Sequence, residues 1–137
     1  MAKLWGGRFS KKTSPLVEEF TKSIHFDQKL AEYDVIGSLT HIGILKKAGL
    51  LTPSEHNQLA GALNIILATI KNGSFFKNLD SSFEDIHSYV QHLVEKKAGK
   101  AALKLHTCRS RNDQVVFDVK DYTFFNVSET GKSLEEF

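Results

Sequence analysis

Apolar residues recur at helical spacing in several stretches of the chain, and this pattern predicts an all-α protein. The clearest stretch begins at residues 52–55, Thr-Pro-Ser-Glu, which have the spacing of a capping box with proline at the first helical position. One apolar stripe follows: Leu59, Leu63, Ile66 and Ile70. The Lys-Asn-Gly sequence at 71–73 then predicts the end of this helix.

Two further helices are predicted before residue 52. Pro15 suits the first turn of a short helix whose apolar residues are Leu16, Val17, Phe20 and Ile24. The pattern from Asp27 indicates a second helix that ends near Gly49. Gly37 and Gly43 within it would allow another helix to pack closely.

After residue 73 the sequence predicts a loop, a helix and a basic connector. Ser81 and Ser82 stand three residues before Glu84 and Asp85, so we expect a helix to begin between them. Its apolar face would consist of Ile86, Val90, Leu93 and Val94. The helix would end near Gly99, and residues 100–104 would form the basic connector.

The last segment, residues 114–127, gives two conflicting signals. Its β-branched and aromatic residues, with Val115, Phe117 and Val119 alternating, favour a strand on propensity alone. A possible capping box from Ser110 to Asp113 lies directly before it, and the preceding segments read as helices. We therefore predict a helix that is apolar on several faces, as a helix surrounded by other helices would be.

Composition excludes several classes of partner. With 137 residues and a net charge of +2, the chain can bury a core but has no charge excess that indicates nucleic acid or membrane. The basic connector has no interleaved aromatic residues for base stacking. No apolar run approaches the ~20 residues that span a bilayer, and no apolar signal segment is seen at the N-terminus. Cys108 is the single cysteine, so we expect a cytoplasmic protein without an internal disulfide.

Residues 105–115, LHTCRSRNDQV, concentrate polar chemistry in front of the last predicted helix. A helix N-terminus attracts anions, and Arg109 and Arg111 would add planar forks that match carboxylate or phosphate oxygens. Asn112 would fix orientation, and His106 could titrate near neutral pH. The simpler alternative is that Ser110 and Asp113 cap the helix while both arginines face solvent.

Other candidate sites are weaker. The sequence EDIH places Glu84, Asp85 and His87 in one turn, where a carboxylate could orient the imidazole for acid–base work. Acidic residues in a first turn also simply complement the helix dipole. His106 and Cys108 have no second ligand pair at zinc spacing, so no metal site is predicted. No nucleophile-elbow, dinucleotide-binding or phosphate-loop motif is present.

Several of these segments together resemble the N-terminal region of the argininosuccinate lyase family, in order and in spacing. The matching segments are LWGGRF at 4–9, FTKSIHFD at 20–27, AGLLT at 48–52, EDIH at 84–87 and KLHTCRSRNDQV at 104–115, with the Asp34…Gly37-Ser38…His41 helix among them. The last segment distinguishes this family from fumarase, aspartase and adenylosuccinate lyase.

The resemblance implies a fold and an activity. The fold would be the N-terminal helical domain of the fumarase/aspartase-type lyase fold, followed by the start of its central helical bundle. Residues 1–14 would form an extended arm, 15–106 the helical domain, and 107–137 the substrate-binding loop with the first part of a bundle helix. The family cleaves argininosuccinate to arginine and fumarate, without a cofactor, in arginine biosynthesis or the urea cycle. Its members are homotetramers whose active sites are shared between subunits.

The resemblance also implies substrate-binding residues. These are Ser23 in the FTKSI stretch, Asn112 with Arg111 beside it, and Asp85 and His87 in EDIH. An arginine-rich helix N-terminus is a reasonable receptor for the carboxylates of argininosuccinate.

Two departures from the family qualify these expectations. The family has glycine where this chain has Cys108, and a cysteine side chain could obstruct the backbone conformation that glycine permits. The later motifs with the catalytic histidine and the catalytic serine loop do not occur in these 137 residues, so we expect no catalytic residue and no activity from this chain alone. The alternative is a non-catalytic binding or structural module derived from the lyase fold.

Overall fold

The computed structural model describes residues 13–137, and every regular element among them is a helix. The all-α prediction is therefore confirmed. The predicted arm, with Trp5 and Phe9, falls almost entirely outside the described residues. None of the helices in the described part is both long and apolar enough to cross a membrane.

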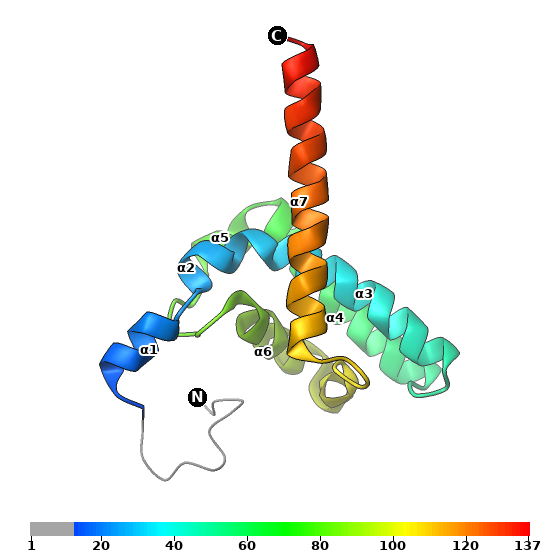
Figure 1. Ribbon diagram of the computed structural model, residues 1–137. Helices are drawn as coiled ribbons and strands as arrows, with labels where there is room; N and C mark the ends of the chain where they lie inside the picture. The colour runs from blue at the N-terminus through cyan, green and yellow to red at the C-terminus, as the bar shows by residue number, and fades with distance from the viewer. Residues whose placement is uncertain (1–12) are drawn as a thin grey trace.

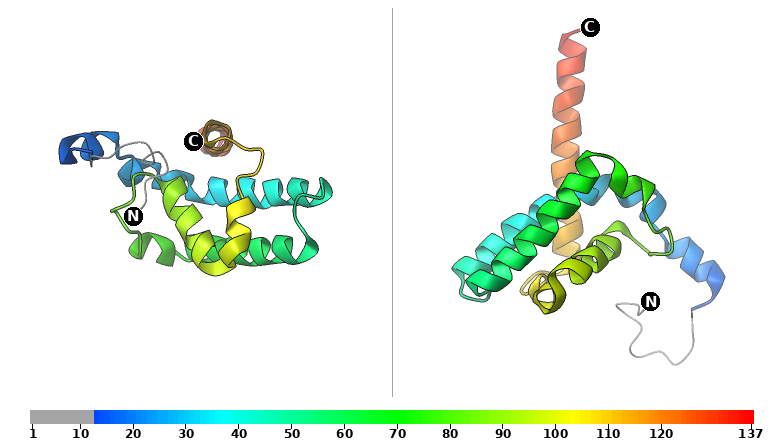
Figure 2. Two further views of the ribbon diagram at one scale, coloured as in Figure 1. Left: turned by 90° about the horizontal axis from the view of Figure 1, so that it is seen from below. Right: turned by 180° about the vertical axis from the view of Figure 1, so that it is seen from behind.

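In chain order the helices are α1 (Pro15–Thr21), α2 (Ile24–Asp27), the 3-10 helix η2 (Gln28–Leu30), α3 (Ala31–Lys47), α4 (Pro53–Lys71), α5 (Ser74–Lys77), α6 (Ile86–Ala98), the 3-10 helix η3 (Gly99–Lys104) and α7 (Arg111–Glu135). Helices α3 and α4 lie side by side, and α6 packs against both of them (Figures 1 and 2). Helix α7 contacts α3 with its first half, and its second half extends away from all the others.

Helix α4 forms where the capping signal predicts it and supplies the centre of the core. The Thr52 hydroxyl accepts a hydrogen bond from the Glu55 N–H at 3.2 Å, and the Glu55 carboxylate accepts one from the Thr52 N–H at 2.9 Å. The predicted apolar stripe is buried: Leu59, Leu63, Ile66 and Ile70. Ile42 and Leu45 from α3 and Val90 and Val94 from α6 belong to the same core.

Helix α3 shows why one of its two glycines matters. A Cβ atom on Gly37 would lie 2.6 Å from the Phe117 ring, so a larger residue would push α7 away from α3. The predicted role of Gly37 in close helix packing is confirmed. The same prediction is wrong for Gly43, because no other element of the described residues lies within 4 Å of the corresponding position. Gly49 follows the end of the helix with φ +73°, as a terminating glycine does.

Helix α6 begins later than predicted. Ser81 and Ser82 lie in a turn, where the Ser82 N–H donates to the Asp80 carboxylate at 2.9 Å. The N-cap is Asp85, whose carboxylate accepts a hydrogen bond from the Ser88 N–H at 2.6 Å. Local hydrogen bonding of Asp80 therefore competes with the helix start that the serine spacing suggested.

Helix α7 confirms the helical interpretation of the ambiguous last segment, but its orientation is unexpected. Its only buried residues are Gln114 and Asp118, which are both polar. Its large apolar side chains are largely exposed: Val116, Phe117, Val119, Phe124, Phe125 and Val127. The short helix α1 likewise buries none of its residues.

Candidate functional site

The N-terminus of α7 is capped as predicted, but its arginines do not face solvent. The Ser110 hydroxyl accepts from the Asp113 N–H at 3.2 Å, and the Asp113 carboxylate accepts from the Ser110 N–H at 2.9 Å. Arg111 Nη1 lies 3.2 Å from Asp85 Oδ1, and Arg109 Nη2 donates to the Ser38 hydroxyl at 3.2 Å. Both arginines thus fasten the loop before α7 to other helices, and the capping-only alternative is wrong about them.

Ser23 and the EDIH segment are joined through an aspartate that the sequence analysis did not single out. The Ser23 hydroxyl donates to Asp27 Oδ2 at 2.6 Å, while Asp27 Oδ1 accepts the Ile86 N–H at 3.1 Å. The Ser23 N–H also donates to the Glu84 carbonyl at 2.8 Å. Burial raises the pKa of Asp27 above its usual value, against the opposing effect of these hydrogen bonds. Asp27 therefore holds the start of α6 beside Ser23.

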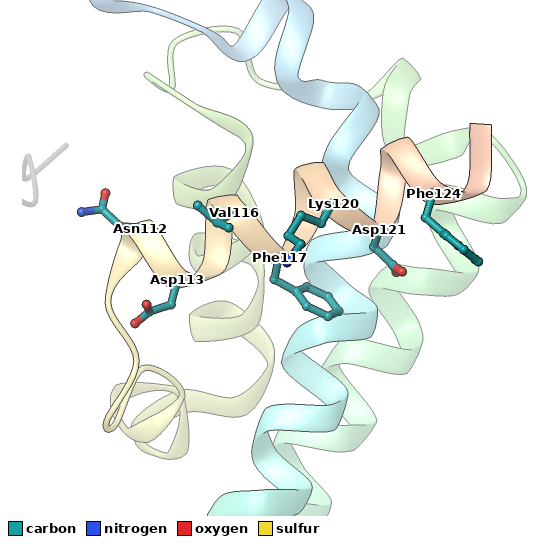
Figure 3. A pocket seen from close by; sticks show the side chains of 7 residues that line it. All are labelled: Asn112, Asp113, Val116, Phe117, Lys120, Asp121 and Phe124. Carbon is teal, nitrogen blue, oxygen red and sulfur yellow. The ribbon is translucent and has the colours of Figure 1, made fainter. Parts of the chain in front are cut away.

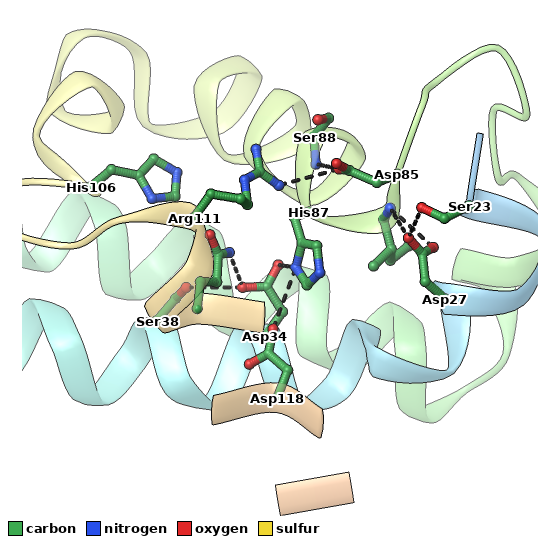
Figure 4. A network of polar contacts seen from close by, with 12 residues as sticks. Ser23, Asp27, Asp34, Ser38, Asp85, His87, Ser88, His106, Arg111 and Asp118 are labelled. Atoms are coloured by element: carbon green, nitrogen blue, oxygen red, sulfur yellow. Dashed lines mark hydrogen bonds and ion pairs between the residues drawn. The ribbon is translucent and has the colours of Figure 1, made fainter. Parts of the chain in front are cut away.

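His87 lies between two buried carboxylates (Figure 4). Its Nδ1 is 3.4 Å from Asp34 Oδ2 and 3.4 Å from Asp118 Oδ2. The three side chains come from α6, α3 and α7, and each is at most 4% exposed. We call Asp34, His87 and Asp118 the buried cluster. It gathers one titratable group from each of three helices at one point.

The buried cluster retains a proton that its groups would lose more readily in water. Burial, together with the negative charge of Asp34, raises the pKa of Asp118 to about 7. Burial lowers the pKa of His87, but the carboxylates of Asp34 and Asp118 outweigh this effect and the net shift is upward. The pKa shifts of Asp118 and His87 are coupled, because the charge of each group affects the protonation of the other.

Two neutral side chains and one cation surround the buried cluster. Gln114 Nε2 donates a hydrogen bond to Asp34 Oδ1, and the Ser38 hydroxyl lies 3.5 Å from the same oxygen. Arg109 is close enough for its charge to interact with both Asp34 and Asp118. Arg111, Gln114 and Asp118 occupy positions i, i+3 and i+7 of α7, so they form one inward face. We call these three residues the polar stripe of α7.

The loop before α7 contains one histidine, His106, which does not titrate near neutrality. Burial, with the positive charges of Arg109 and Arg111, lowers the pKa of His106 to about 4. The expectation that His106 could act near neutral pH is therefore wrong, because an imidazolium there would be buried beside two cations. His41 Nε2 lies 3.0 Å from the Thr107 carbonyl and links the loop to α3.

Cys108 is exposed and has φ +59°, in the left-handed region that favours glycine. It is the one residue other than glycine with positive φ in the described part of the chain. The loop thus adopts the conformation for which glycine is suited even though a side chain is present. The thiol points to solvent and does not enter the buried cluster.

Asn112 is separated from the other predicted site residues. It is exposed at the first turn of α7, and Figure 3 shows its side chain directed away from the neighbouring helices. It lines an open surface pocket with residues of the outer face of α7: Asp113, Val116, Phe117, Lys120, Asp121 and Phe124. The structure therefore brings together Ser23, Asp85, His87 and Arg111, and leaves Asn112 on the opposite face of α7.

The buried cluster contains ligand types that can hold a metal ion, although the sequence predicted none. One ligand atom from each residue lies within 4.8 Å of the others. However, the two carboxylates already face the His87 imidazole and the Arg109 guanidinium, so a dication would leave excess positive charge in a buried space. We therefore interpret the cluster as a proton-sharing group that orients an imidazole.

Comparison with known proteins identifies the family of the chain. The profile of a protein family described as "Lyase" matches residues 7–130. Proteins named "Argininosuccinate lyase" from Pelotomaculum thermopropionicum and Deinococcus radiodurans are 47% and 49% identical over 122 and 121 residues, which are 89% and 88% of this chain. Another so named, from Heliobacterium mobile, is 42% identical over 98% of the chain. The chain covers 26%, 25% and 29% of these relatives' lengths, about a quarter. The family profile spans most of the chain, and the chain belongs to this lyase family.

Proposed function

We propose that the protein is an argininosuccinate lyase, which cleaves argininosuccinate to arginine and fumarate, and that this chain contributes part of its substrate-binding surface. The observation that carries the proposal is identity of 42–49% to relatives of that name over a region that includes every predicted site residue. The reaction is a β-elimination. A base removes a proton from Cβ, the bond to the arginine nitrogen breaks, and an acid protonates the departing nitrogen.

Arg111 and Asp85 would form the anion-binding part of the surface. Arg111 presents a planar fork next to the N-terminus of α7, and its 3.2 Å contact with Asp85 fixes the orientation of that fork. The carboxylates of argininosuccinate match such a fork, and a carboxylate beside the reacting carbon would be stabilised as negative charge develops. Ser23 and Asn112 would add hydrogen bonds that orient the substrate.

His87 would contribute a polar ring nitrogen rather than the base that removes the Cβ proton. Its Nδ1 already faces Asp34 and Asp118, which leaves Nε2 for an outside partner. The resemblance places the catalytic histidine and serine in motifs that these 137 residues do not contain. The chain's own residues would therefore bind and orient the substrate, and no cofactor enters the scheme.

We further propose that the protein is cytoplasmic and works as a homotetramer with shared active sites. Support for the assembly comes from the outer face of α7, where Phe124 is 74% exposed and Val127 is 65% exposed. Exposed apolar area of this kind is typical of an interface with another chain. Asn112 lies at the beginning of the same outer face, so a substrate bound to Asn112 would also lie next to a neighbouring subunit.

The direct test is to incubate the complete natural protein with argininosuccinate and to monitor fumarate production by its ultraviolet absorbance. Argininosuccinate should be consumed, whereas adenylosuccinate, aspartate and malate should not. The 137-residue chain alone should release no fumarate. Binding of argininosuccinate without any turnover by the complete protein would contradict the proposal and favour the non-catalytic module.

A further inference from the structure

The polar stripe of α7 contacts two residues that the proposed function assigns to substrate binding, Asp85 and His87. Arg111 contacts Asp85 at 3.2 Å, Gln114 binds Asp34, and Asp118 contacts His87 at 3.4 Å. Gln114 and Asp118 are the only buried residues of α7, although the helix has many apolar side chains. A helix that buries two polar residues and leaves Phe124 and Phe125 exposed is not placed by core packing alone. Its contacts define where two side chains of α6 point.

His87 has two distinct ring nitrogens in this environment. Nδ1 is sealed from solvent and lies 3.4 Å from one carboxylate oxygen of each aspartate, without a hydrogen bond to either. No hydrogen bond within the described part of the chain involves Nε2. Nε2 is also absent from the polar atoms that are sealed from solvent without a partner. A carboxylate opposite Nδ1 holds the proton on that nitrogen and leaves Nε2 as the nitrogen that can meet another molecule.

Asp118 has less support from hydrogen bonds than Asp34 has. Asp34 accepts hydrogen bonds from Gln114 and Ser38, but neither carboxylate oxygen of Asp118 has a hydrogen-bond partner, and the residue is 1% exposed. Burying a carboxyl group costs free energy unless a nearby polar or charged group interacts with it. His87 Nδ1 lies 3.4 Å from Asp118 Oδ2.

We propose that Asp118 is a positioning residue for the lyase reaction: with Asp34 it orients His87 so that Nδ1 carries the inward proton and Nε2 is presented to the substrate. The inference rests on the proposed function for its catalytic part, and on geometry alone for the state of the imidazole. Asp118 does not touch substrate. It acts on the reaction through the ring of His87.

Charged groups from several elements surround His87 and affect its pKa. Asp34 from α3 and Asp118 from α7 lie against Nδ1, and Asp85 at the start of α6 adds negative charge. Asp27 from α2 interacts with the His87 charge, and Arg109 from the loop before α7 interacts with both carboxylates of the cluster. Changing Asp118 alone leaves the other four groups in place.

Nitrogen-15 NMR of the imidazole rings tests the geometric part on the unmodified chain. His87 should be the Nδ1–H tautomer when neutral, and its pKa should lie above the usual histidine value. Asp118→Asn should lower the His87 pKa by about one unit, because the negative charge that Asp118 gains as pH rises through its pKa of about 7 is lost. Glu129→Gln, which removes an exposed carboxylate from the same helix, should change nothing. An Nε2–H tautomer in the unmodified chain, or an unchanged pKa in Asp118→Asn, would overturn the proposal.

Kinetics of the complete natural protein test the catalytic part. In Asp118→Asn the limb of the pH profile of kcat/KM that depends on His87 should move to lower pH by about one unit. A loss of activity at all pH values with no movement of this limb would assign Asp118 a merely structural role and reject the inference. If the protein makes no fumarate from argininosuccinate, the proposed function fails, and the NMR result still decides the orientation of His87.

Discussion

Raising the pH from about 4.5 to about 6.5 should destabilise this chain, because the buried cluster binds a proton in the folded state that the unfolded chain releases. Asp118 has a folded pKa of about 7 against an ordinary value of 3.8, so its carboxyl group stays protonated in the native protein through this range. A group whose folded pKa is raised contributes stability that is lost as pH rises toward that pKa. His87, whose pKa is also raised, continues the loss above the ordinary histidine value of 6.5.

The size of the effect follows from one extra proton. A difference of one bound proton changes the free energy of unfolding by about 1.4 kcal/mol per pH unit, or up to ~3 kcal/mol over two units. With a urea m-value of about 2 kcal/mol per molar, the midpoint of unfolding should fall by about 1 M or somewhat more. Glu55, Asp80 and Asp113 have lowered pKa values and act in the opposite direction, because their stabilising effect grows as the unfolded carboxyl groups ionise around 4.5 and 3.8. This opposing effect is confined to the lower end of the chosen range.

Urea unfolding followed by circular dichroism at several pH values provides the assay. Asp118→Asn keeps a neutral side chain at every pH, so its midpoint should depend much less on pH than that of the unmodified chain. Glu129→Gln should keep the original pH dependence, since its carboxylate is exposed and outside the buried cluster. Parallel curves for the unmodified chain and Asp118→Asn would refute the reasoning and show that Asp118 is ionised in the folded state.

Three other predictions concern the binding loop and the outer face of α7. Cys108→Gly should stabilise the chain by about 1 kcal/mol relative to Cys108→Ala, because positive φ is unfavourable for a residue with a Cβ atom and not for glycine. The activity of the complete protein should be equal or improved in Cys108→Gly. Equal stability of the two variants would show that the left-handed conformation carries no cost. In the complete protein, Ser23→Ala and Asn112→Ala should each reduce kcat/KM by an amount equivalent to ~1.5–3 kcal/mol. Arg111→Lys should also reduce kcat/KM, because an ammonium group cannot reproduce the planar fork of a guanidinium. Unchanged kinetics in all three variants would reject their role in binding. The isolated chain should self-associate through its exposed aromatic residues, and light scattering that shows a cooperative monomer across micromolar concentrations would contradict this.

Helix starts were predictable where the signal is local. The capping boxes at Thr52 and Ser110 each use two residues three positions apart, and both form as expected. The serines at 81 and 82 have similar spacing, yet the helix starts at Ile86. The reason is also local but was not visible as a pattern: Asp80 binds the Ser82 N–H and holds a turn.

The candidate site was predictable only in part, because its links join distant segments. Ser23, Asp85 and His87 came from the resemblance, but Asp27 connects two of these segments through a contact between residues 59 positions apart. The pKa of His106 was also unpredictable, since it depends on burial of the imidazole and on the nearby charges of Arg109 and Arg111. A sequence shows that charged residues are neighbours along the chain, but not which of them will be buried together.

Helix α7 explains why apolar pattern alone was misleading at the site. Its many apolar residues predicted a helix that other helices surround on several faces. The structure instead turns Gln114 and Asp118 inward and leaves Phe124 and Phe125 exposed. One sequence signal was available: Arg111, Gln114 and Asp118 are polar and share one helical face. In α7, the polar residues at i, i+3 and i+7 therefore indicate the side of the helix that faces the candidate site, whereas the apolar pattern does not.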